Sequence, residues 1–160
     1  VYGHDDRVCA YAELMAILET EAPEMVGPYG LQPFEMKVQG IDRTMIDKVF
    51  AICDYYMKGD VRRHSRHIYD IFKLLPMVSL NDDLGKLIKE VREVRAKNVS
   101  ICHSAQPGVD VPGVLMEIVE KEIYRADYES VTSRILEEQI PYDTAIGAIR
   151  RIAESGLFVE

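Results

Sequence analysis

Two neighbouring segments, RTMIDKVFAICDYY (Arg43–Tyr56) and RHSRHIYDIFKLL (Arg63–Leu75), decide the fold of this chain. In both, apolar residues recur at intervals of three and four, the repeat that gives an α-helix one buried face. Ser65 is a typical residue to cap the start of the second helix, while Gly59 and Pro76 are placed to end the first and the second. The sequence therefore predicts two consecutive amphipathic helices.

Further helices are predicted around these two segments. Thr44, with Asp47 three residues later, forms an approximate capping box that places the start of the first helix. Asn81 is a typical cap for a third helix. The residues of this third helix that we expect to face the core are Leu84, Leu87, Ile88, Val91 and Val94. Three more helical patterns follow, over 114–124, 128–138 and 143–154.

The first forty residues read differently from the rest. Phe34, Met36 and Val38 alternate with charged residues, which predicts a short strand. Residues 8–21 fit both an amphipathic helix and a buried strand, and periodicity leaves the two open. We therefore expect a mainly α protein, α+β overall: a helical bundle over residues 41–160, preceded by a small β-containing segment over 1–40.

Composition and charge restrict the class of protein. With 48% apolar and 29% charged residues the chain is expected to be globular, and it has no apolar run long enough to span a membrane. Its three cysteines lie far apart, so we expect inert thiols, a reducing compartment and a cytoplasmic location. The net charge of -8 argues against general nucleic-acid binding.

One short segment is basic although the chain as a whole is acidic. It contains a single acid, Asp60, among Lys58, Arg62, Arg63, His64, Arg66 and His67. A cluster of this kind is a candidate anion site, and a solvated loop between two helices is the alternative.

Three side chains on the two helices are candidates for chemistry. Arg66 and Asp70 are four residues apart and share a face with His67 and Lys73, so they can form an ion pair on one helix. The surrounding cations would keep Asp70 ionised, as a base, a metal ligand or an anchor for another side chain. Lys48, on the preceding helix, either binds a phosphate in a cleft or extends from a half-buried face towards water.

The two segments, together with a later stretch that begins at Tyr124, resemble the AbiEii family of nucleotidyltransferase toxins. In that family a helix carrying a lysine is followed by an R-H-x-x-D or R-x-x-D pattern. The resemblance implies that Lys48 contacts the nucleotide phosphates and that Asp70 is the acid of the last motif, which makes both of them candidate catalytic residues. It also implies that Arg66 assists that acid or the phosphates, and Arg63 is a further candidate for nucleotide binding. The expected reaction is nucleotidyl transfer from a nucleoside triphosphate to an acceptor such as tRNA.

The metal site that the resemblance implies is missing from the sequence. The family holds Mg²⁺ with a Gly-Ser motif and a D-x-D or D-x-E pair, and this sequence has no Gly-Ser pair. Its one D-x-E, formed by Asp127 and Glu129, falls in a predicted helix and is expected to face solvent. Glu19 resembles the family's third carboxylate, which would make residues 14–20 a strand.

These observations leave two classes of function. In the first, residues 1–40 are the remnant of a nucleotidyltransferase domain and 41–160 its C-terminal helical domain. The chain, which begins at Val1, would then be an inactive part of a longer enzyme that uses Mg²⁺, and would itself bind no cofactor. In the second, the chain is noncatalytic: either a helical module that binds an antitoxin or another protein, or a complete small protein that has lost the catalytic half.

Overall fold

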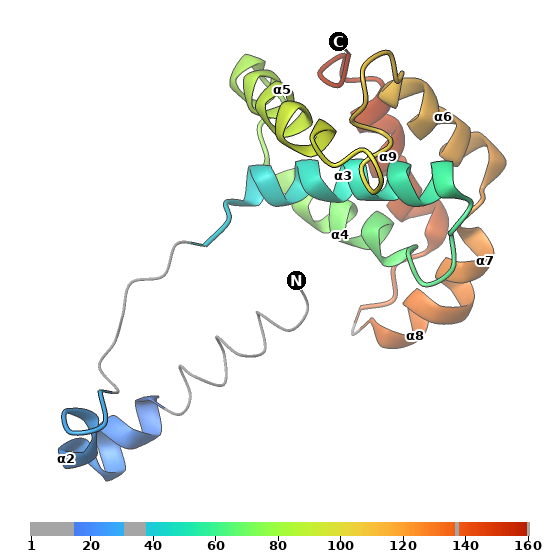
Figure 1. Cartoon of the computed structure of the whole chain (residues 1–160). Helices are drawn as coiled ribbons and strands as arrows, with labels where there is room; N and C mark the ends of the chain where they lie inside the picture. The colour runs from blue at the N-terminus through green and yellow to red at the C-terminus, as the bar shows by residue number, and fades with distance from the viewer. Residues whose placement is uncertain (1–14, 31–37, 137, 160) are drawn as a thin grey trace. The chain divides into compact units, whose positions relative to one another are not determined.

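The computed structural model describes residues 15–30, 38–136 and 138–159. The chain divides into two compact units, Val1–Val38 and Gln39–Glu160. In the first unit, residues 15–21 are helical and are followed by the short helix α2 (Pro23–Val26), which begins with its proline (Figure 1). The boundary between the two units falls between Val38 and Gln39.

The predicted β-containing segment is wrong. Regular secondary structure is helical wherever the described ranges form any, and they contain no strand. Residues 15–21 follow the helical alternative: Met15 is buried while Ile17 is 57% exposed, as expected for a helix with one apolar face and not for a buried strand. Residues 34–37 of the expected strand lie outside the described residues, and Val38 is exposed.

The second unit is a helical bundle centred on α3 (Figure 1). Helix α3 contacts α4, α5 and α6, and α9 contacts α4 and α6. Helix α4 ends at Leu74, and the next three residues, Leu75–Met77, form a 3-10 turn that contains Pro76. The helices are α3 (Ile41–Lys58), α4 (Arg66–Leu74), α5 (Asp82–Ala96), α6 (Val111–Lys121), α7 (Arg125–Asp127), α8 (Ser133–Ile135) and α9 (Tyr142–Ala153). Between α7 and α8 the chain forms a π-helical turn, Tyr128–Thr132.

The ends of α3 and α5 test the predicted caps. Gly59 ends α3 in the left-handed conformation (φ 72°), as predicted, and Asn81 caps α5 by accepting a hydrogen bond from the Leu84 N–H at 3.0 Å. The predicted capping box is wrong, because α3 begins at Ile41 and the Thr44 hydroxyl donates to the Gly40 carbonyl inside the helix. The Asp47 carboxylate is instead used in tertiary contacts.

The core lies around α3 and α9. Helix α3 buries Ile46, Val49, Phe50 and Cys53 completely, because neighbouring helices cover it on several sides. The remaining interior comes mainly from α4, α5, α6 and α9, which all turn an apolar face towards this centre. Most of the predicted core-facing residues of α5 are at least partly buried, but Val94 is 53% exposed and its prediction was wrong.

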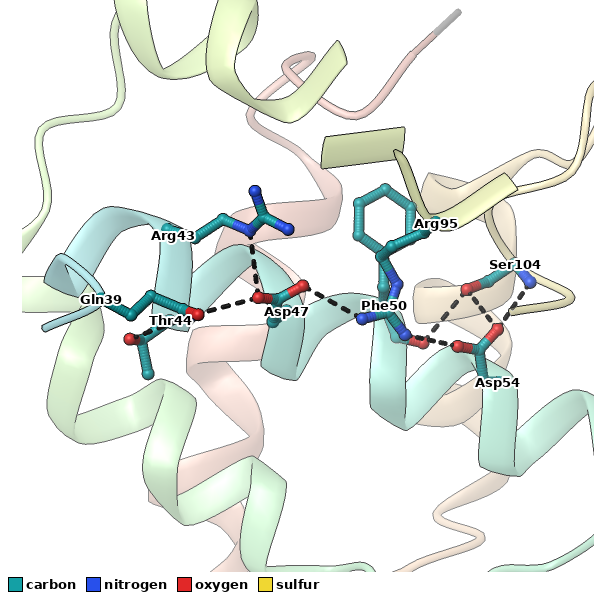
Figure 2. Close-up of polar contacts among 8 residues, drawn as sticks. All are labelled: Gln39, Arg43, Thr44, Asp47, Phe50, Asp54, Arg95 and Ser104. Atoms are coloured by element: carbon teal, nitrogen blue, oxygen red, sulfur yellow. Dashed lines mark hydrogen bonds and ion pairs between the residues drawn. The ribbon is translucent and has the colours of Figure 1, made fainter. Parts of the chain in front are cut away.

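Ion pairs join α3 to α5, and hydrogen bonds join α3 to the loop that follows α5 (Figure 2). Arg95 of α5 binds Asp47 at 3.0 Å and the buried Asp54 at 2.8 Å. The other oxygen of Asp54 accepts hydrogen bonds from the N–H and hydroxyl of Ser104, both at 2.7 Å. The buried charges are thus paired and hydrogen-bonded, the condition under which a protein interior tolerates them.

Within the part of the chain that the structure describes, no helix is both long and apolar enough to cross a membrane.

Candidate functional site

Lys48 and Asp70 form the centre of the candidate site. Lys48 Nζ on α3 lies 2.7 Å from Asp70 Oδ2 on α4, and the two side chains are 25% and 23% exposed. The structure thus brings together the two residues that the sequence singled out on separate helices. The bond also favours one of the roles considered for Asp70, that of an anchor for another side chain.

His67 lies beside this pair, buried under α3. Its Nδ1 is 3.9 Å from Asp70 Oδ2, and its ring is parallel to that of Tyr55. Tyr55 also stacks on His64, with ring centroids 3.4 Å apart. The sequence placed His67 on the polar face of α4, which was wrong because α4 packs between α3 and α9 and has two covered sides.

The two histidines do not add to the positive charge of the site. Burial, and then the nearby Lys48 and Arg66, lower the pKa of His67 to about 3. Burial also lowers the pKa of His64, more than the nearby Asp60 raises it. The basic character of this region at neutral pH therefore comes from its lysine and arginine side chains.

The arginines stand on the loop that leads into α4. Arg62 and Arg63 are exposed, and Arg66, the first residue of α4, donates to the Arg63 carbonyl at 2.8 Å. Arg63 has a positive φ of 65°, which is unusual for a residue other than glycine. The Arg66 side chain thus bonds the backbone of the loop, while the side chains of Arg62 and Arg63 are exposed to solvent.

The contact that holds this loop comes from Asp127, which sequence reasoning placed in solvent. That prediction was wrong: its carboxylate accepts hydrogen bonds from the backbone N–H groups of Arg63 and Ser65 and from the Ser65 hydroxyl. Burial alone would raise the pKa of Asp127, but these hydrogen bonds outweigh burial and the pKa lies below its ordinary value. No local pattern could have shown a contact between residues this far apart in sequence.

Ser65 likewise has a different role from the predicted one. It stands directly before α4, but its hydroxyl does not cap the helix. It is fully buried and bonds Asp127 and Thr132, both at 2.7 Å.

The described residues do not provide a metal site. Nowhere in residues 15–30, 38–136 and 138–159 do three His, Cys, Asp or Glu side chains gather so that they could hold an ion. Glu19, the candidate metal ligand, is exposed on the helix over 15–21, not on a strand. Among the described residues, no group of side chains therefore matches the carboxylate set that the sequence resemblance implied for Mg²⁺.

The lysine and arginines offer what a phosphate group needs. Guanidinium and ammonium groups form short, charge-assisted hydrogen bonds to phosphate oxygens, and Lys48, Arg63 and Arg66 lie on α3, α4 and the loop between them. The family model "Nucleotidyl transferase AbiEii toxin, Type IV TA system" matches residues 9–148. The chain belongs to the AbiEii nucleotidyltransferase toxin family. No curated protein and no solved structure matches it.

Membership of the AbiEii family confirms the resemblance that the two segments suggested. The matched residues include the whole of α3 and α4, the loop between them and the π-helical turn. The family match thus contains both the Lys48–Asp70 pair and the Asp127 contact.

Proposed function

We propose that this chain contributes the nucleotide-phosphate-binding side of an AbiEii-type nucleotidyltransferase. In this proposal the full-length protein uses Mg²⁺ to transfer a nucleotide from a nucleoside triphosphate to an acceptor such as tRNA. The observation that carries the proposal is the Lys48–Asp70 ion pair, formed by two residues that the family resemblance singled out.

In this proposal Lys48 and Asp70 have different roles. Lys48 is a compact charge, three-quarters buried, which allows it to meet a phosphate at the edge of the site. Asp70 fixes the direction of the ammonium group from α4. A bound phosphate would share Lys48 with Asp70, so Lys48 is the catalytic residue and Asp70 holds it in place.

Arg63 and Arg66 extend the positive charge beyond Lys48. A triphosphate carries several charges, and binding it in one orientation takes more than one cation. The Arg66 guanidinium group bonds the Arg63 carbonyl, which ties Arg66 to the backbone of the residue that carries the second charge. We assign the two arginines to binding of the nucleotide phosphates. We assign no described residue to holding the metal, because the described residues include no cluster of three or more possible metal ligands.

The test uses the full-length protein with Mg²⁺, labelled nucleoside triphosphates and tRNA. Lys48→Ala and Asp70→Asn are expected to abolish transfer of the label. The matched control is the exposed pair of Lys86 and Asp83 on α5, also 2.7 Å apart. Lys86→Ala and Asp83→Asn should leave transfer unchanged. Normal transfer by both site variants would remove the assigned roles.

For the chain by itself we expect no transfer and only weak nucleotide binding. Its sequence has neither the Gly-Ser motif nor a D-x-D pair, and a triphosphate bound without Mg²⁺ keeps its full charge. Turnover by purified chain, absent from the Lys48→Ala variant, would show that this expectation is wrong.

The family description also bears on partners and location. It names toxins of type IV toxin–antitoxin systems, so we propose a cognate antitoxin protein as a partner and the cytoplasm as the location. Co-purification of the tagged full-length toxin with the product of the neighbouring gene would test the partner.

A further inference from the structure

Asp127 makes a set of contacts that no local role explains. Its Oδ1 accepts the Arg63 N–H at 2.8 Å, and its Oδ2 accepts the Ser65 N–H at 3.2 Å and the Ser65 hydroxyl at 2.7 Å. These bonds cross more than sixty positions of sequence. One carboxylate thus holds both ends of the tripeptide Arg63–Ser65.

The segment held in this way contains a strained residue. Arg63 adopts the left-handed region, which side chains with a Cβ rarely enter. Such a conformation persists where surrounding contacts impose it, and functional sites are among the places where strained residues cluster. The bond from the Arg63 N–H to Asp127 is a contact of this kind.

The π-helical turn explains how Asp127 reaches Ser65 together with Thr132. Residues five apart on an α-helix, with about 3.6 residues per turn, point to different sides. In a π-helical turn each N–H bonds the carbonyl five residues earlier, which brings such residues onto one side. Asp127 directly precedes the turn Tyr128–Thr132, and Thr132 is its last residue. Both bond the Ser65 hydroxyl oxygen.

The loop fixed by these contacts is the one that carries the arginines. Asp127 binds Arg63 through its backbone N–H, while the Arg63 side chain is exposed. The carboxylate therefore holds the backbone of the loop, and this bond does not involve the Arg63 guanidinium group. Arg66, bonded to the Arg63 carbonyl, is tied to the same segment.

We propose that Asp127, aligned with Thr132 by the π-helical turn, is a positioning residue for triphosphate binding, because it fixes the loop from which Arg63 and Arg66 meet the phosphates. This inference rests on the proposed function. In this inference the segment 125–132 supports the phosphate site formed by α3 and α4. A substitution that removes the support is expected to weaken nucleotide binding while the fold is kept.

The test compares Asp127→Asn with Glu129→Gln. In Asp127→Asn an amide NH₂ group replaces one acceptor oxygen and faces a donor, while size and shape are kept. Glu129, two residues further on, is exposed and pairs with Arg125, so Glu129→Gln is the matched control. Ser65→Ala removes only the hydroxyl contacts and serves if Asp127→Asn does not fold.

Two measurements on the chain separate positioning from folding. Hydrogen exchange should become faster at the Arg63 and Ser65 amides in Asp127→Asn, with the amides of α3 and α9 unchanged. NMR titration with inorganic tripolyphosphate, which contains no base, should show an affinity about tenfold weaker, the loss expected for one misplaced charged contact. Arg63→Ala should also weaken binding, and the losses should not add up in the double variant, because Asp127→Asn misplaces a side chain that Arg63→Ala removes.

The outcomes distinguish this inference from the proposed function. If Lys48→Ala weakens tripolyphosphate binding while Asp127→Asn speeds exchange but leaves affinity unchanged, Asp127 is purely structural and the inference is overturned. Unchanged exchange in Asp127→Asn would overturn it as well. If the unmodified chain does not bind tripolyphosphate at all, the phosphate site itself is wrong, and the proposed function fails together with the inference.

Discussion

Lys48 Nζ donates to Asp70 Oδ2 at 2.7 Å, which joins α3 to α4 across a separation of 22 residues in sequence. Each residue alone has an ordinary explanation as a surface charge. Together they form a partly buried ion pair between two packed helices, with about one-quarter of each side chain exposed.

The energetic coupling of this pair is measurable. In a double-mutant cycle with Lys48→Met and Asp70→Asn, we expect a coupling of about 1 kcal/mol in the free energy of unfolding, because the partly buried pair is less screened than a surface pair. Urea denaturation of the four proteins gives this value. Strictly additive losses would mean that the two charges do not stabilise each other.

Arg95 is expected to contribute more to stability than Lys48. Arg95→Met would leave Asp54, which is 4% exposed, without its cationic partner, and should lower the free energy of unfolding by about 3 kcal/mol. Lys89→Met on the exposed side of the same helix is the control and should change little. A similar loss in both variants would show that Asp54 does not need Arg95.

His67 should make the protein sensitive to acid. Its pKa is about 3 in the folded protein, against an ordinary value of 6.5, so between these values the unfolded chain binds a proton that the folded chain does not. The titration of His67 therefore does not lower the free energy of unfolding above about pH 6.5. Towards pH 3 it lowers this free energy by at most about 1.4 kcal/mol per pH unit.

The change His67→Phe isolates this contribution. The aromatic ring keeps the contact with Tyr55 but does not titrate, so the variant should lose less stability on acidification than the unmodified protein. Urea denaturation at several values between pH 7 and pH 4.5 provides the comparison. Parallel curves for the two proteins would show that His67 titrates normally.

Cys53 is expected to be inert in the folded protein. It is fully buried, and burial, followed by the nearby Asp54, raises the pKa of its thiol. Iodoacetamide at pH 8 should therefore leave the Cys53 peptide unmodified in the native protein and alkylate it in urea, as mass spectrometry would show. Rapid alkylation of native Cys53 would indicate that α3 opens locally.

The sequence by itself determined the helices and the residues on which the proposal depends. Apolar spacing predicted α3, α4 and α9 within a few residues, and Gly59 and Asn81 were correctly assigned as caps, because these signals act over one or two helical turns. The family resemblance selected Lys48 and Asp70. Short apolar runs are ambiguous between helix and strand, which is why the β-containing segment was predicted wrongly.

Only the tertiary structure decided how those residues are used. Asp70 is paired with Lys48, and His67 is buried between helices. Asp127, expected to face solvent, instead binds the backbone of the loop that precedes α4. Such contacts depend on the packing of helices far apart in sequence, and on a π-helical turn that aligns residues an ordinary helix would separate. Local patterns do not carry that information, because they repeat along one element and specify no partner on another.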